Sequence, residues 1–354
     1  MILASNGTGV LGCGMTTAVG YTAAETCAAV RAKISGATRS EFMALGGTLV
    51  ACAQVPFPKP TPTGLLRHAL LLEGPLRECL ACLGETPVGQ VPLLIGLPEI
   101  GRVDRPPGVD ARLLPLLEEL LQVRFHPDSK TIPAGRVAGG IGLLEATRML
   151  ADNLCEFAIV AGVDSYVSAP AVYHYDDRFR ILSERNSDGF IPGEAGAAVL
   201  VGSHPGPGTL RVRSVGLGVE AATIGGDLAL RGDGLTAAYR QALEDTGLGL
   251  HDVKYRMASC SGEAYWFKEA ALALGRVTRV RREFQDFWHP AECIGEAGAA
   301  AVPGMLAIAF MAAAKGYAPG ESCMIHASND DDKRIALLVD RVGGAAHVRS
   351  TGAG

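Results

Sequence analysis

Hydrophobic and polar positions follow two patterns along the chain. Short unbroken apolar runs, such as Pro92 to Leu97, predict strands that are covered on both faces of a sheet. Longer stretches with apolar residues at helical spacing, such as Leu65 to Leu83, predict helices that bury one side. The segment Ser203 to Thr209 is dense in Pro and Gly and separates two series of such elements. Each series runs strand, helix, strand, helix, strand, which indicates an α/β fold with duplicated halves.

These series set the expected domain organisation. The first half is predicted to span residues 1–203 and the second residues 208–342. The tail, residues 343–354, is rich in Gly, Ala and Ser and is expected to be disordered. A chain of 354 residues has room for two such halves around a shared core.

The centre of the first half combines a tight turn, a helix and a strand. The turn at Pro133-Ala134-Gly135 leads into a helical pattern, and a strand is expected from Phe157 to Val163. A helix that starts in the interior would lower the pKa of a cysteine at the turn and make it a nucleophile. The turn instead continues with Arg136 and Val137, so a site built like an acyl-transfer centre lacks its reactive group.

Composition and charge indicate which classes of binding partner are expected. Hydrophobic residues make up 48% of the chain and charged residues 19%, which favours extensive burial, including burial between subunits of a homo-oligomer. The net charge is -5 and no basic run occurs, so neither a nucleic-acid nor an anionic-membrane partner is expected. The longest apolar stretch, Ala297 to Ala314, is rich in Ala and Gly and favours a buried helix over a membrane span.

The nine cysteines are odd in number and scattered, which is typical of reduced, buried thiols in a cytoplasmic protein. Cys79 and Cys82 are spaced as in a CxxC pair, but no second pair or histidine cluster completes a zinc site. We therefore expect no metal and no cofactor. The N-terminus has neither a basic region nor a long apolar run, so no signal peptide is expected.

Four segments in order resemble the β-ketoacyl synthases, which are thiolase-fold condensing enzymes. They are GVLGCGMTTAVGYTAAETCAAVRAKISGAT near the start, AIVAGVDS from Ala158, ILSERNSDGFIPGEAGAAVLV from Ile181 and ECIGEAGAAAVPGMLAIAF from Glu292. The third segment is the most specific, because Asp188-Gly189-Phe190 and Gly193-Glu194-Ala195-Gly196 stand at that family's spacing. The resemblance runs from about residue 8 to residue 340. It implies a thiolase-like α/β fold in five layers, helix, sheet, helix, sheet, helix.

The same resemblance locates the family's catalytic groups, a cysteine and two histidines, at positions that hold none of them. The cysteine falls at Val137, the first histidine at Ser259 or Cys260, and the second histidine at Glu292. The Gly-rich loop that closes the family's pocket is replaced by Ala327 to Arg334. Catalytic groups that act as a unit cannot all be lost while a useful reaction rate remains. The resemblance therefore implies a degenerate member of the family without condensing activity.

Several residues allow a second interpretation. Cys260, with His289 or Glu292 as base, can be read as a relocated nucleophile, as can Cys293, but buried core thiols are the favoured interpretation. Glu263, Glu292 and Glu296 can supply a carboxylate pair. We expect instead that all three glutamates are solvated residues at helix starts.

Three further features lie in the segments assigned to the former site. Arg136 can bind an anion or plug the acyl tunnel, and the plug is preferred. The run Asp330 to Asp332 suggests a cation site, but three adjacent acids cannot all face one ion, so a solvated loop is expected. Trp266, Phe267 and Trp288 are expected to fill the vacated pocket rather than to form a partner-facing patch.

Two function classes follow. The first is a catalytically inactive binding protein: a companion to an active synthase, as chain-length factors are, or an adaptor or chaperone for another protein such as a secreted effector. The alternative is an acyltransferase or condensing-type enzyme with a rewired site that acts on acyl thioesters. The resemblance further implies a homodimer, or a heterodimer with a ketosynthase-like subunit, formed by edge pairing of the strand near Phe157 to Val163.

Overall fold

Ten strands form one hydrogen-bonded sheet in the computed structural model, which describes residues 7–343. The strands of this sheet are β1 (Thr8–Thr17), β4 (Leu93–Leu97), β5 (Lys130–Pro133), β6 (Phe157–Ser165), β7 (Glu194–Gly202), β8 (Leu210–Val219), β9 (Tyr255–Ala258), β10 (Asp286–Trp288), β11 (Ser322–Ser328) and β12 (Lys333–Arg341). A separate hairpin joins β2 (Thr38–Met43) to β3 (Leu49–Cys52). The apolar runs of the sequence therefore became strands, as predicted.

The strand order shows the duplication directly. Along the sheet the strands lie in the order β10-β9-β11-β12-β8-β1-β7-β6-β4-β5. Counted within each half, both sets therefore have the order third, second, fourth, fifth, first. The two sets meet only where β1 pairs with β8, at Thr8 to Val10 opposite Leu210 to Val212. The duplicated α/β architecture is confirmed, whereas the domain boundaries at residues 203 and 208 stay a prediction.

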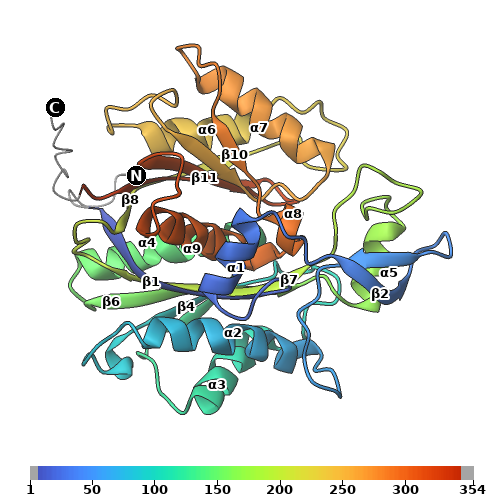
Figure 1. Cartoon of the computed structure of the whole chain (residues 1–354), viewed down its shortest axis with the longest axis horizontal. Helices are drawn as coiled ribbons and strands as arrows, with labels where there is room; N and C mark the ends of the chain where they lie inside the picture. The colour runs from blue at the N-terminus through green and yellow to red at the C-terminus, as the bar shows by residue number, and fades with distance from the viewer. Residues whose placement is uncertain (1–6, 344–354) are drawn as a thin grey trace, which may run out of the picture.

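Helices lie on both outer sides of the folded sheet and also between its two halves (Figure 1). The helices are α1 (Ala23–Arg31), α2 (Gly64–Leu80), α3 (Val109–Leu121), α4 (Ala138–Ala151), α5 (Ala169–Asp176), α6 (Asp233–Leu243), α7 (Ala264–Val277), α8 (Ala291–Ile294) and α9 (Ala301–Ala314). Helices α2 and α3 form one outer layer, α4 and α9 the middle layer, and α6 and α7 the other outer layer (Figure 1). The five layers match the expected thiolase-like fold.

Small residues allow the two middle helices to pack closely. A Cβ atom on Gly139 in α4 would lie 2.4 Å from the Cδ atom of Pro303 in α9. A Cβ atom on Gly140 would lie 2.2 Å from Cδ1 of Ile335 in β12. The Ala- and Gly-rich composition of α9 therefore reflects a helix buried between two sheet halves, and Val302 and Leu306 within it are fully buried.

The strand that was predicted to form the dimer interface does not lie at an edge of the sheet. Strand β6, which contains Phe157 to Val163, pairs with β4 on one side and with β7 on the other. Both edges of β6 are therefore paired within the chain. The prediction that a dimer forms by edge pairing of this strand is wrong. The outermost strands of the sheet are β5 and β10.

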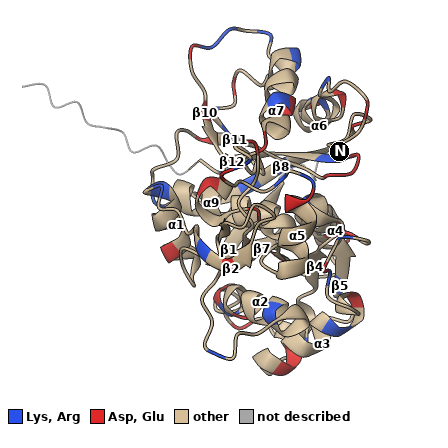
Figure 2. Cartoon of the chain, turned by 90° about the vertical axis from the view of Figure 1, so that its right-hand side faces the viewer, with Lys and Arg blue, Asp and Glu red and all other residues tan. Residues whose placement is uncertain are grey.

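The remaining sequence predictions concern membranes, charge and the tail. No helix within residues 7–343 is both long and apolar enough to cross a bilayer. Basic and acidic positions are interspersed over the layers (Figure 2). The predicted disordered tail lies, from residue 344 onward, outside the described residues.

Candidate functional site

A short 3-10 turn, Gly135–Val137, leads into α4 and occupies the position expected for the nucleophile. Gly135 has a positive φ of 59°, which allows this tight entry into the helix. The backbone N–H of Val137 donates to Oδ1 of Asn329 at 3.3 Å, and Nδ2 of Asn329 donates to the carbonyl of Ala134 at 2.8 Å. One asparagine therefore closes the helix entrance from both sides, and the Val137 side chain is buried hydrocarbon.

Arg136 is a buried cation held between two carboxylates. Its side chain is 4% exposed, and its Nε donates to Oε2 of Glu296 at 2.9 Å. Its Nη1 donates to Oδ1 of Asp330 at 2.8 Å. The guanidinium carbon lies 5.0 Å from the ring centroid of Trp266. Arg136 therefore fills this position with its own side chain and its own counterions.

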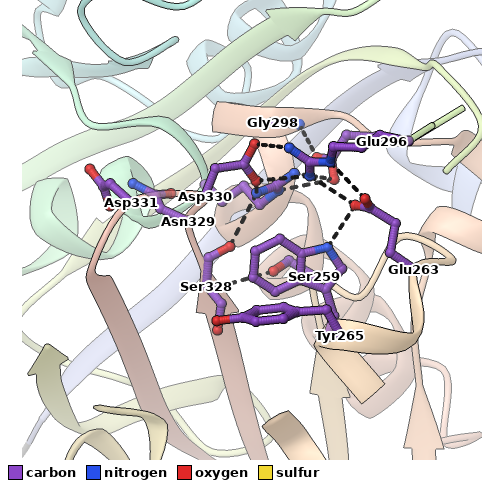
Figure 3. A network of polar contacts seen from close by, with 12 residues as sticks. Ser259, Glu263, Tyr265, Glu296, Gly298, Ser328, Asn329, Asp330 and Asp331 are labelled. Carbon is purple, nitrogen blue, oxygen red and sulfur yellow. Dashed lines mark hydrogen bonds and ion pairs between the residues drawn. The ribbon is translucent and has the colours of Figure 1, made fainter. Parts of the chain in front are cut away.

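A second arginine completes the network around Asp330 (Figure 3). Arg180 donates to Asp330 at 2.6 Å and to Glu263 at 2.7 Å, and the indole N–H of Trp266 donates to Glu263 at 3.0 Å. Burial alone would raise the pKa of Asp330, but Arg136 and Arg180 hold this pKa well below its usual range. The expectation of a solvated loop is therefore wrong for Asp330.

The loop from Ser328 to Lys333 is held by a separate buried ion pair. Arg334 is 1% exposed, and its Nε donates to Glu269 at 2.7 Å. Its Nη1 also donates to the carbonyl of Asn329 at 2.9 Å, while Ser328 Oγ donates to Glu269 at 2.6 Å. These contacts keep the loop against the start of α4, because Asn329 bonds to both segments.

The three predicted acids lie in different environments. Glu292 is exposed, whereas Glu296 and Glu263 are buried in ion pairs with Arg136 and Arg180. The expectation that all three are solvated is wrong for Glu263 and Glu296. Glu296, rather than Glu292, lies beside the turn that precedes α4.

The two candidate nucleophiles, Cys260 and Cys293, are both buried in the core. Cys260 is 4% exposed, and burial raises the pKa of its thiol well above the ordinary value. Burial also raises the pKa of Cys293 to about 11. Ser259 accepts a bond from the backbone N–H of Ser328 at 3.3 Å. Each of the nine cysteines has a raised pKa, so none is favoured as a thiolate.

The three aromatic residues do not form one cluster. Trp266 packs over Arg136 in the ionic network. Phe267 lies against His289, with ring centroids 5.3 Å apart, so this imidazole faces an aromatic ring. Trp288 lies 5.1 Å from Tyr255, ring centroid to ring centroid. Only Trp266 fills the region beside the turn.

A small cavity lies beside Glu296. A cavity of about 30 Å³ is lined by residues that include Ser259, Glu296 and Met305. One buried water needs roughly 10–15 Å³ of such volume, so the cavity has room for about two waters and not for an acyl chain. Among residues 7–343, no group of three or more His, Cys, Asp or Glu side chains is placed to hold a metal ion.

The ionic network was the main feature that sequence reasoning missed. Arg180, Glu269 and Arg334 were not singled out, although Arg334 directly precedes the apolar run Ile335 to Val339. A charged residue next to a strand that is buried on both faces is a signal for a buried partner. The sequence does not say which partner that is.

The layers, the repeated strand order and the turn before α4 define a thiolase-like fold of the ketosynthase type. No family model and no curated protein matches the chain. Among solved structures, the ishigamide ketosynthase/chain length factor has a TM-score of 0.70 at 18% identity, covering 95% of this chain and 100% of that one. A ketosynthase in complex with its chain length factor from Xenorhabdus doucetiae has a TM-score of 0.72 at 13% identity, covering 95% and 98%.

A third solved structure, a type II PKS acyl-carrier protein in complex with its ketosynthase bound to the hexaketide, has a TM-score of 0.76 at 14% identity. The alignment covers 95% of this chain and 100% of the chain in that structure. The expected resemblance is thereby confirmed at the level of the fold. Identities this low carry no residue roles from these proteins to this chain.

Proposed function

We propose that the protein is a catalytically inactive, ketosynthase-like subunit that acts by binding a protein partner. The observation that carries this proposal is the filled position before α4, where Arg136 is enclosed by Glu296 and Asp330. A condensing reaction needs a thiolate at this turn and room for the acyl group that it carries. Val137 supplies no nucleophile, and Arg136 acts as a plug in the space.

The alternative of a rewired enzyme is less well supported. Cys260 is the nucleophile that it requires, but burial favours the neutral thiol there. His289, the proposed base, packs against Phe267 and Phe287. The adjacent cavity of about 30 Å³ does not accommodate an acyl thioester.

Intact-mass spectrometry tests the lack of acyl transfer. After incubation with the N-acetylcysteamine thioester of hexanoic acid, we expect no mass increase, while an active ketosynthase treated in parallel acquires one acyl group. The reason is that every thiol of this chain is favoured in its unreactive protonated form. A stable adduct that disappears in Cys260→Ser or Cys293→Ser would contradict the proposal and establish a working acyl-enzyme.

A companion role is supported by the kind of structure that the chain resembles. The similar solved structures include ketosynthases together with chain length factors. We propose a homodimer, or a heterodimer with a ketosynthase-like subunit, that pairs along β5, an outermost strand of the sheet. A cytoplasmic location is part of the proposal, since all nine cysteines are free thiols.

Hydrogen exchange tests the proposed interface. In the dimer, the backbone amides of β5 (Lys130–Pro133) that face away from β4, all of them before Pro133, should exchange about tenfold or more slowly than they do after dilution to monomer, because a partner strand covers them. The other outermost strand, β10 (Asp286–Trp288), is the internal reference and should not change. Light scattering fixes the oligomeric state in the same samples. A dimer whose β5 amides exchange at the monomer rate would exclude this interface.

A further inference from the structure

A pocket of about 420 Å³ lies between the end of α1, strand β10 and Tyr317. Its apolar lining includes Val30, Pro290 and Ile308. The volume is within the range of roughly 300–1,000 Å³ that is typical of small-molecule sites. It is more than ten times larger than the cavity beside Glu296, so it is the better candidate for a ligand site.

Two aromatic side chains supply flat walls for this pocket. The rings of Trp288 and Tyr317 are close to parallel, with an interplanar angle of 25° and centroids 6.5 Å apart. Trp288 belongs to the core cluster on the α9 side of β10, whereas the preceding Phe287 packs on the α7 side, as the alternation of a strand requires. An apolar ligand body can therefore lie against aromatic faces.

One corner of the pocket offers a cation without a carboxylate partner. The guanidinium carbon of Arg31 lies 4.6 Å from the ring centroid of Tyr317. Arg31 is exposed, and among residues 7–343 no carboxylate lies within ion-pair distance of its side chain. A guanidinium in this position suits an anionic oxygen.

The other charged groups of the pocket are partly balanced. Lys33 and Glu292 both line the pocket. Asp286 lies on β10 and also lines the pocket. Of these charged groups, Arg31 is the one that lies over the ring of Tyr317.

We propose that this pocket binds small carboxylic acids with a flat apolar body. The apolar part lies against Trp288 and Tyr317, and the carboxylate accepts hydrogen bonds from Arg31. Neither the missing nucleophile nor a protein partner is needed for this binding, so the site stands apart from the proposed companion role.

Calorimetric titration with three matched compounds tests the charge preference. The compounds are 4-phenylbutanoate, 4-phenylbutan-1-ol and 4-phenylbutylamine, which share one ring and chain and differ in the charged end. We expect the acid to bind about tenfold more tightly than the alcohol, and the amine to bind most weakly. Arg31→Ala should remove the tenfold advantage of the acid and leave the affinity for the alcohol within about twofold. Arg77→Ala, which removes one exposed cation from α2, is the control and should change neither affinity.

Fluorescence locates the bound acid, because the chain has two tryptophans, Trp266 in the ionic network and Trp288 in the pocket. Saturation with 4-phenylbutanoate should change the emission of the natural protein but not that of Trp288→Phe. Equal affinities for all three compounds, no binding of the acid at millimolar concentration, or an Arg31→Ala protein that binds the acid as Arg77→Ala does would each overturn the proposal.

Discussion

Replacement of Arg136 by methionine is expected to lower the free energy of unfolding by about 3–5 kcal/mol. Methionine keeps much of the side-chain length and volume but removes the charge. Glu296 would then lose its cation, whereas Asp330 would keep Arg180, and Glu296 is 2% exposed, so water cannot replace the arginine. A buried carboxylate without a counterion is costly, which is why the expected loss exceeds that of an ordinary surface substitution.

Urea unfolding at pH 7 measures this effect, with Arg148→Met as the matched control. Arg148 also has two carboxylate partners, Glu145 and Asp152, but its side chain is 56% exposed. Its loss should cost much less, because water and salt screen an exposed ion pair. The double variant Arg136→Met, Glu296→Gln should recover part of the loss, because it also removes the carboxylate that Arg136→Met leaves unpaired. If Arg136→Met were as stable as Arg148→Met, the network would not be the closed ionic cluster described above.

The fold was predictable because its signals are local. The unbroken apolar run Pro92 to Leu97 indicated a strand covered on both faces, and β4 lies within it. The Ala-rich stretch from residue 298 to residue 314 indicated a buried helix, which is α9 with the short turn before it. Which strands lie side by side is not local information. For this reason the sequence identified β6 as a central strand but assigned it wrongly to the sheet edge.

The candidate site was only partly predictable. The lack of a nucleophile at Arg136 and Val137 is written in the sequence, and the structure places both residues at the start of α4. The surroundings of Asp330 cannot be predicted from the sequence. Three adjacent acids suggest a solvated loop, and the arginines that enclose Asp330 lie 194 and 150 residues away in the chain. The wrong expectation of a solvated Glu296 has a similar cause: four residues separate the exposed Glu292 from the buried Glu296, and the local pattern does not distinguish them.

The ionic network explains how so many charged groups can be buried beside the turn before α4. Buried polar groups are destabilising unless each finds a partner. Here the partners of the carboxylates are arginines, which have enough donors to satisfy several acceptors at once. Arg136 and Arg180 share Asp330, and each also contacts its own glutamate. The network therefore forms a polar part of the core.

The stability of the protein is expected to fall as the pH drops from 7.5 to 5, because two buried histidines must stay neutral. Burial lowers the pKa of His68 to about 4 and that of His326 to about 3, and the charge of Arg256 adds to the effect at His326. In the unfolded chain both have a pKa near 6.5. Since the unfolded state binds protons first as the pH falls, each histidine stabilises the fold fully above pH 6.5 and loses this contribution toward its folded pKa.

The expected loss between pH 7.5 and pH 5 is about 2 kcal/mol for each histidine, from 1.36 kcal/mol per pH unit below 6.5. Urea unfolding across this range measures it. His326→Gln and His68→Gln should each flatten the profile by about that amount, whatever they do to stability at pH 7.5, because only the slope reports the titration. His204→Gln is the control, since His204 is exposed and its replacement should leave the slope unchanged. A profile that stays flat in the natural protein would mean that the unfolded and folded states take up protons alike, so that His68 and His326 are not held neutral.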